Sequence, residues 1–261
     1  MTIYIYRVNA FANNLTSGNP AYVVKTNEQK SEVWMQQLAL EFNQPITAFV
    51  TLKKDNNYIL RWFTPSQEIS LCGHGTLASA HILWEENQVS KESPIYFSTK
   101  SKNLEVKYLN EGIQMAFPSD PPAPIHIPNL LQQALSVPIK NVESNSDRYI
   151  VELENEELVK SIEPNFDLLS TLPSIGIVVT SLSSKYDFIS RYFAPSIGVK
   201  EDFVTGSAHC GLAPYWNKRL KKKKFHAFQA SKRGGELVIE YEDDITYITG
   251  KAYTIYKGIL S

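Results

Sequence analysis

The spacing of hydrophobic positions predicts a chain that alternates strands with a few helices. Short runs rich in Val, Ile and Tyr predict strands, and the first two, "TIYIYRVNAF" and "AYVVK", are separated by the turn residues "TSGNP". In "SEVWMQQLALEFN", by contrast, Trp34, Leu38 and Phe42 recur every four residues. Ser31 precedes them as a candidate N-cap. We therefore expect a helix here, and strands again in "ITAFVTL" and "YILRWFTP".

A proline-rich segment, "FPSDPPAPIHIPN", interrupts this pattern and excludes a continuous helix or a central strand. It predicts a domain boundary near residues 118–128, with an N-terminal lobe of residues 1–118 and a C-terminal lobe of residues 129–261. Beyond it, "RYIVEL", "SIGIVVTSL" and "YDFISRYFAP" predict strands, and "TGSAHCGLAPYWNKRL" predicts a helix that begins at a glycine. The closing segment, "GELVIEYEDDITYITGKAYTIYKGIL", indicates two or three antiparallel strands, the last of which has the option of packing back on the N-terminal lobe.

The two halves contain an internal repeat. "RWFTPS" at 61–66 and "RYFAPS" at 191–196 share Arg, Phe, Pro and Ser in register. Each is followed by a glycine-containing helical segment, and aligning "LCGHGTLASAHILW" with "VTGSAHCGLAPYW" matches Gly73 with Gly206. The repeated order indicates a gene duplication and predicts two pseudo-symmetric lobes, with a functional site in the cleft where they meet.

Composition and charge narrow the classes of partner. Hydrophobic residues make up 43% and charged residues 20%, which is typical of a globular protein, and the net charge of −1 gives no bulk attraction to nucleic acid or to an anionic membrane. The N-terminus lacks the features of a signal peptide, and no apolar run approaches the ~20 residues that span a bilayer. With only Cys72 and Cys210, a disulfide framework is not expected. These features together favour the cytoplasm.

The two glycine turns are candidates for binding an anion. A helix N-terminus presents unpaired N–H groups and a partial positive charge, and glycine lets a ligand approach the backbone. Gly73 and His74 would form one such start, and Gly206 and Ser207 the other, so that a small carboxylate could be held between them. The alternative is that these glycines only allow close packing.

Four residues in or near the two glycine turns are candidates for chemistry. His74 can donate or accept a proton near neutral pH, and Asp202 could orient it, hold a proton itself, or serve only as a turn residue. Cys72 is a candidate nucleophile, because a helix N-terminus favours a thiolate, but the repeat places Thr205 opposite it, which disfavours a two-thiol racemase. Cys210 falls inside the second helix, as a small hydrophobic residue. The spacing of the cysteines and histidines does not match a zinc site, so we expect no metal.

Three segments together resemble the PhzF-like phenazine-biosynthesis family: "VNAFANNLTSGNPAYVV", "RWFTPSQEISLCGHGTLASAHIL" and "YFAPSIGVKEDFVTGSAHCGLAPYW". The resemblance implies an α+β fold like that of diaminopimelate epimerase, in which each lobe is a mostly antiparallel barrel-like sheet around a central helix. It also implies a homodimer without metal or organic cofactor. The implied activity is isomerisation by a proton shift in a small cyclic carboxylic acid, which is a dihydro-hydroxyanthranilate for the family's namesake enzyme.

The resemblance also implies roles for individual residues. It assigns proton transfer to His74 and Asp202, and assigns substrate binding to a second set: Gly73, Gly206, Ser207 and Asn19. One position departs from the family pattern, because "NQPITAFV" places Ile46 where the family has its proton-shuttling glutamate. An aliphatic side chain cannot move a proton. Three interpretations therefore stay open: an isomerase or close derivative, an inactive or altered relative that binds a small anion, and a pure interaction protein.

Overall fold

The computed structural model describes residues 2–260 and divides the chain into two compact units. Unit 1 comprises Met1–Ala116 and Thr249–Ser261, and unit 2 comprises Phe117–Ile248. The division lies next to the proline-rich segment, and the final strand belongs to unit 1. Among the described residues, no helix is both long and apolar enough to cross a membrane.

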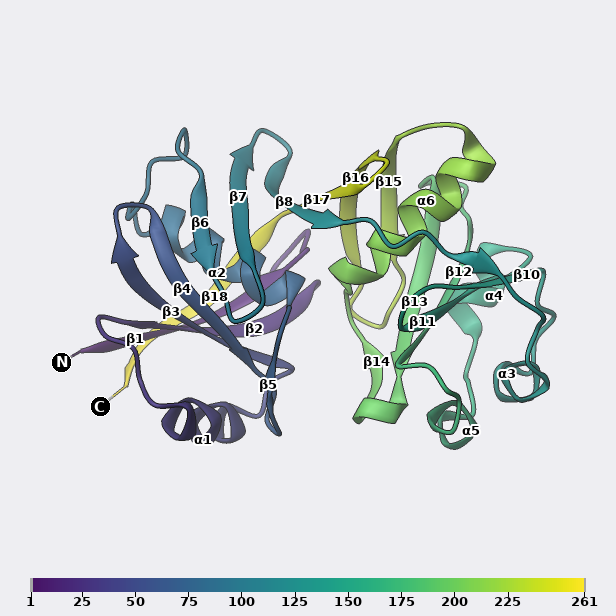
Figure 1. Cartoon of the computed structure of the whole chain (residues 1–261), viewed down its shortest axis with the longest axis horizontal. Coiled ribbons are helices and arrows are strands. Elements are labelled where there is room, and N and C mark those ends of the chain that lie inside the picture. Colours follow the sequence, from purple (N-terminus) through teal and green to yellow (C-terminus); the bar gives the residue numbers. More distant parts are fainter. Residues whose placement is uncertain (1, 261) are drawn as a thin grey trace. The chain divides into compact units, whose positions relative to one another are not determined.

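Unit 1 is a curved sheet with two helices (Figure 1). Its elements are β1 (Ile3–Ala10), β2 (Asn19–Thr26), α1 (Glu32–Phe42), β3 (Ile46–Lys54), β4 (Asn57–Phe63), β5 (Glu68–Ile69), α2 (Gly73–Glu85), β6 (Ile95–Ser98), β7 (Asn103–Leu109), β8 (Gly112–Pro118, which crosses the division) and β18 (Ala252–Leu260). β1 pairs antiparallel with both β2 and β18, so the last strand lies beside the first. β2 and β3 are parallel, β3 and β4 antiparallel, and β4 runs parallel to β6.

Unit 2 repeats this topology. Its elements are β9 (Ala123–Pro124), α3 (Asn129–Leu135), β10 (Asn141–Ser144), β11 (Arg148–Glu152), α4 (Glu156–Ser161), α5 (Phe166–Ser170), β12 (Gly176–Leu182), β13 (Phe188–Ala194), η1 (Pro195–Ile197), β14 (Val199–Asp202), η2 (Gly206–Ala208), α6 (His209–Leu220), β15 (Lys224–Gln229), β16 (Gly235–Glu242) and β17 (Ile245–Gly250). β11 and β12 are parallel, β12 and β13 antiparallel, and β13 runs parallel to β15, as β2, β3, β4 and β6 do in unit 1.

The register of these strands confirms the predicted repeat. Arg61 of β4 lies opposite Phe49 of β3, and Arg191 of β13 lies opposite Val179 of β12. Both arginines form a bidentate ion pair with a glutamate of the next short strand, Arg61 with Glu68 and Arg191 with Glu201. The shared Arg is therefore a structural residue that ties two adjacent strands together.

Helix α2 forms the centre of unit 1, where it packs against β1, β2, β3 and β18. All but two of its 13 residues are buried. Small residues at its start allow this close packing, and its hydroxyl groups bond within the helix: Thr76 donates to the carbonyl of Cys72 at 2.6 Å, and Ser79 to that of Gly75 at 2.7 Å. The helix is therefore packed on nearly every side.

Helix α1 covers the sheet of unit 1 through an amphipathic face. Its N-cap is Ser31, whose hydroxyl accepts the N–H of Trp34, as the sequence predicts. The residues at the centre of its packing are Met35 and Ala39, while the predicted stripe of Trp34, Leu38 and Phe42 is only partly buried around them.

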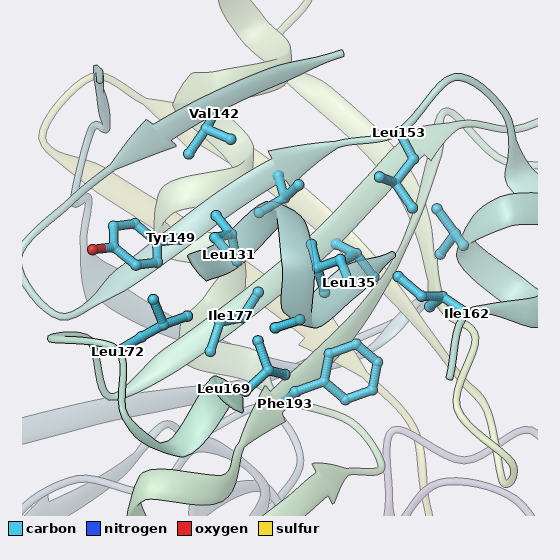
Figure 2. Packing of buried hydrophobic residues seen from close by; sticks show 14 of the residues in the cluster. Leu131, Leu135, Val142, Tyr149, Leu153, Ile162, Leu169, Leu172, Ile177 and Phe193 are labelled. Atoms are coloured by element: carbon cyan, nitrogen blue, oxygen red, sulfur yellow. The ribbon is translucent and has the colours of Figure 1, made fainter. Parts of the chain in front are cut away.

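Unit 2 has its own hydrophobic core, which α3, α4 and α5 help to form (Figure 2). Leu131 and Leu135 of α3 lie near Tyr149, Ile177 and Phe193 of the sheet. These three helices have five to seven residues each, which is too short for a stable isolated helix, so this packing must supply their stability.

Candidate active site

The N-terminus of α2 is capped by a sulfur atom. Cys72 has an extended backbone, and its Sγ accepts the N–H of Gly75 at 3.3 Å. Its carbonyl accepts both the N–H and the hydroxyl of Thr76. The thiol is buried and forms no disulfide. Cys72 therefore has a structural role at this helix start, whatever chemistry takes place beside it.

His74 is the titratable residue of this helix start. It is 8% exposed, and its Nδ1 lies 3.4 Å from Asn19 Nδ2 and 3.5 Å from Cys72 Sγ. The amide group of Asn19 thus contacts Nδ1 by a hydrogen bond. Asn19 is the fully buried first residue of β2, so a strand of the core holds the His74 ring in place.

Ile46 borders the same helix start. It begins β3, is 2% exposed, and has its Cγ2 3.0 Å from the point where a Cβ on Gly75 would lie. Trp62 Cδ1 lies 2.8 Å from that point. Gly75 is thus required for close packing. Within residues 2–260 the buried indole N–H of Trp62 has no hydrogen-bond partner, so a polar group faces an apolar wall here.

In unit 2, Asp202 is held by a buried hydrogen-bond chain. The hydroxyl of Thr205 donates to Asp202 Oδ2 at 2.5 Å. Gln229, at the end of β15, accepts the N–H of Thr205 at 2.7 Å and donates to the Asp202 carbonyl at 2.8 Å and to the Thr205 hydroxyl at 3.2 Å. Gln229 is completely buried. It therefore fixes the segment that joins β14 to the second helix start.

Ser207 lies beside a buried arginine. Arg148 forms a bidentate pair with Asp147, at 2.5 and 2.7 Å, and its Nη1 donates to Ser207 Oγ at 3.4 Å. Burial alone would lower the pKa of Arg148, but the hydrogen bonds that it donates to Asp147 and the charge on that carboxylate raise the pKa overall. Arg148 is consequently a permanent positive charge next to the second helix start.

The second helix start differs from the expected one. Gly206 begins a one-turn 3-10 helix, η2, and α6 begins only at His209, so the expectation of an α-helix that opens at this glycine is wrong. The carbonyl of Thr205 explains the difference, because it accepts the N–H of Ala208 at 3.1 Å and the Nδ1–H of His209 at 3.0 Å. Further along, Pro214 leaves the carbonyl of Cys210 without its helical donor, and the N–H of Asp120 bonds to it instead.

His209 itself is a buried neutral histidine. It is 0% exposed and stacks on Phe188 at 6.0 Å. Burial lowers its pKa to about 4. Its Nε2 has no hydrogen-bond partner among the residues the structure describes. The ring therefore stays uncharged at neutral pH, and its role is to bond the Thr205 carbonyl.

The structure thus groups the predicted site residues by unit. Unit 1 brings together His74, Asn19, Gly73 and Ile46, and unit 2 brings together Asp202, Gly206 and Ser207. Sequence reasoning missed Arg148 and Gln229. The only signal for Arg148 is a charged residue at the head of the apolar run "RYIVEL", and nothing in the sequence around Gln229 indicates its bonds. Within residues 2–260, no group of three or more His, Cys, Asp and Glu side chains could hold a metal ion.

Comparison with known proteins first supports the class of fold. A predicted epimerase from Pseudomonas aeruginosa, 17% identical, superposes with a TM-score of 0.78 over 100% of this chain and 99% of the other. At that identity the likeness concerns the fold alone. Together with the repeated topology, it confirms an α+β fold of the diaminopimelate epimerase type, with two pseudo-symmetric lobes.

The sequence comparisons then identify the family. The model of PhzC-PhzF, phenazine biosynthesis-like proteins, matches residues 8–258. An uncharacterized isomerase of Halalkalibacterium halodurans is 46% identical over 100% of this chain and 99% of its own length. A crystal structure of a PhzF-family protein from Enterococcus faecalis, 38% identical, superposes with a TM-score of 0.96 over 100% of both chains. This chain belongs to the PhzF family.

Proposed function

We propose that this protein is an isomerase that moves a proton within a small cyclic carboxylic acid, with His74 as the group that transfers it. The observation that carries the proposal is the contact between Asn19 and Nδ1 of His74, at 3.4 Å, which holds the ring at the start of α2. The protonated ring gives its Nε2 proton to one carbon of the substrate. The neutral ring that results takes a proton back from another carbon, which isomerises the substrate and restores the histidine. The relative from Halalkalibacterium halodurans, named an uncharacterized isomerase, supports this class of reaction.

Substrate binding follows from the electrostatics of the helix start. The 13-residue α2 has no acidic residue in its first turn, and the positive end of its dipole lies at Gly73. The partial positive charge of about half a unit at this N-terminus attracts a carboxylate. The contributions of Asp202 as a second proton-transfer group, and of Gly206 and Ser207 as binding residues, stay predictions.

One observation favours a second candidate function, a small-anion-binding protein without isomerase activity. Ile46 is buried against the start of α2, at the position where the family pattern has its acid-base glutamate. Loss of such a group typically lowers a rate by about 10²–10⁴, and by more when it is the sole proton shuttle. The helix start and its affinity for an anion would remain.

Deuterium exchange distinguishes these two functions. The protein is incubated in D₂O with dihydro-hydroxyanthranilate and with a panel of cyclic carboxylic acids, and incorporation is followed by ¹H NMR. We expect exchange that His74→Ala reduces at least about 100-fold, while His226→Ala, which removes an exposed histidine of unit 2, leaves it unchanged. Binding without exchange for any acid of the panel would establish the anion-binding function instead.

Substitution of Ile46 provides the complementary test. Ile46→Glu places a carboxylate beside the unpartnered indole N–H of Trp62, which can donate to it. If the scaffold has lost its base, this variant gains exchange activity over the parent protein, whereas Ile46→Gln, of the same shape without the acid-base group, does not. Equal rates for the two variants would show that position 46 has no role in proton transfer.

A further inference from the structure

Unit 2 contains a pocket of about 430 Å³ that has no part in the assignments above. Its wall is formed by the turn between β10 and β11, the loop before β12, and η1. Four serines and Asn145 contribute to the lining, and Arg148 is its only basic residue. Asp147, which pairs with Arg148, and three apolar residues complete the lining. The pocket therefore combines neutral hydrogen-bonding groups and apolar surface with one Arg–Asp pair.

The guanidinium of Arg148 is held rigidly. The residue is 9% exposed, Asp147 binds its Nε and Nη2 edge, and the ring of Tyr192 lies 5.5 Å from its centre. A guanidinium has five N–H groups, and this fork leaves those of Nη1 for other partners. Nη1 points to Ser207, at 3.4 Å from Oγ. Little side-chain entropy remains to be lost when a ligand binds.

Arg148 Nη1 and Ser207 Oγ can both donate hydrogen bonds, as the binding of a carboxylate requires. Because Ser207 Oγ accepts from Nη1, its own hydrogen is available for donation, and the second N–H of Nη1 also points away from Asp147. The two groups thus offer adjacent donors. The backbone of this helix start is a weaker anion-binding element, since η2 has only one turn. The Thr205 carbonyl already accepts two hydrogen bonds.

We propose that Arg148 Nη1 and Ser207 Oγ form a carboxylate-binding site of unit 2, with the neighbouring pocket receiving the body of the ligand. Arg148 is then a specificity-determining residue that selects an acid over its amide. The inference rests on the proposed function in that Ser207 is one of the residues expected to bind the substrate, and it adds a charged side chain to what was expected to be a backbone site.

Titration with a matched pair of probes tests the site. Cyclohex-1-ene-1-carboxylate and the uncharged cyclohex-1-ene-1-carboxamide are added to ¹⁵N-labelled protein, and the Arg148 Nε–H and Ser207 amide resonances are followed. We expect both resonances to shift with the acid and not with the amide. Equal shifts with the two probes, or none at either residue, would overturn the proposal.

Three variants give the expected order of affinity for the acid. Arg148→Met should weaken binding about ten- to a hundredfold, because it removes a charge-assisted hydrogen bond. Arg148→Lys should bind the acid with an affinity between those of the parent protein and Arg148→Met, since lysine keeps the charge without the planar fork of N–H groups. Asp147→Asn should strengthen binding, because it removes the neighbouring negative charge while Arg148 remains. The control is Lys200→Met, which removes one exposed positive charge of the same unit and should change affinity less than twofold.

The outcomes separate this site from the isomerase activity. Deuterium exchange in the parent protein, combined with equal affinity of Arg148→Met for the acid, would overturn the carboxylate site and leave the proposed function standing. Acid-specific shifts at Arg148 and Ser207 in a protein without any exchange would support the site and exclude the isomerase. If the circular dichroism spectrum shows that Arg148→Met is misfolded, Arg148→Lys and Asp147→Asn provide the test. The proposal then requires weaker binding of the acid in the first variant and stronger binding in the second.

Discussion

The two units of this protein have the same strand order, yet their helix starts are built from different chemical groups. In unit 1, a thiol caps α2 and an asparagine fixes a histidine. In unit 2, a one-turn 3-10 helix precedes α6, and the polar groups are Asp202, Ser207 and the buried Arg148. The two units therefore share a strand order but differ in the side chains that set the charge at each helix start.

One pair of contacts shows how much of the framework is shared. Thr76 bonds through its side chain to the carbonyl of Cys72, four residues earlier, and His209 bonds in the same way to the carbonyl of Thr205. The bond is equivalent, but a hydroxyl has been exchanged for an imidazole. Since the imidazole of His209 can take up a proton in acid and the hydroxyl of Thr76 cannot, these two positions should respond differently to acid.

The largest expected effect concerns the repeated arginines. Arg191 binds Glu201 and also donates to three carbonyls at the end of α4. Arg61 binds Glu68, which keeps a second partner in Lys100, and the exposed Glu32. Arg191→Met should lower the free energy of unfolding by about 3–5 kcal/mol, and Arg61→Met by about 2 kcal/mol. Urea denaturation of the two variants measures the difference. Equal losses would mean that the three carbonyl contacts of Arg191 contribute no more than the exposed Arg61–Glu32 pair.

The second prediction is the acid response of His209. Its pKa is lowered to about 4 in the folded protein from 6.5, so the unfolded chain binds the additional proton between these values. Stability is therefore lost as the pH falls from 6.5 to 4, by about 3 kcal/mol. His209→Thr copies the hydroxyl of unit 1 and should remove this part of the pH dependence. Denaturation curves of parent and variant at pH 7 and pH 4 test it, and parallel losses in both proteins would contradict it.

A smaller effect is expected at Gly75. The repeat matches this glycine with Ala208, which already has a Cβ, whereas a Cβ at Gly75 would meet Trp62 and Ile46 at 2.8 and 3.0 Å. Gly75→Ala should lower the free energy of unfolding by about 1–3 kcal/mol through overpacking. The reverse exchange in unit 2, Ala208→Gly, should cost only about 0.5–1 kcal/mol. A thermal shift of the same size for both variants would show that the two helix starts are packed alike.

The smallest effect concerns the cap of α2. Cys72→Ser replaces a sulfur acceptor by a hydroxyl, the preferred N-cap group, and should change the free energy of unfolding by less than about 1 kcal/mol. Cys72→Ala removes the cap and should cost about 1 kcal/mol. Thermal unfolding of the two variants measures this. A loss above 2 kcal/mol in the serine variant would mean that the thiol is more than a cap.

Much of the fold could be predicted because short stretches of the sequence contain the signals for it. Ser31 and the apolar spacing behind it gave a capped helix, and the repeated Arg and Phe of β4 and β13 gave the duplication. The segments that received no prediction lack such local signals. The three short helices of unit 2 depend on packing, and the alternating strand β7 has three exposed residues at its end.

The site was less predictable because its main contacts join distant residues. Asn19 and His74 are 55 positions apart, and Arg148 and Ser207 are 59 apart. No periodicity or motif encodes such a pair. His74 itself could be found because glycines flank it, and Ile46 because it departs from a family pattern, whereas Gln229 acts only through the backbone and hydroxyl of residues 24 and 27 positions away.

The pairing of β18 with β1 has a consequence for synthesis on the ribosome. Unit 2 is a continuous segment, but unit 1 needs its last strand to complete the sheet beside β1. At translation rates of about 5–20 residues per second, residues 117–248 take on the order of ten seconds to make. During that time the residues of unit 1 already made leave the backbone of β1 as an open edge, at which two nascent chains could pair. β1 is thus made well before the strand that covers its edge, and unit 1 depends on β18 to end this exposure to aggregation.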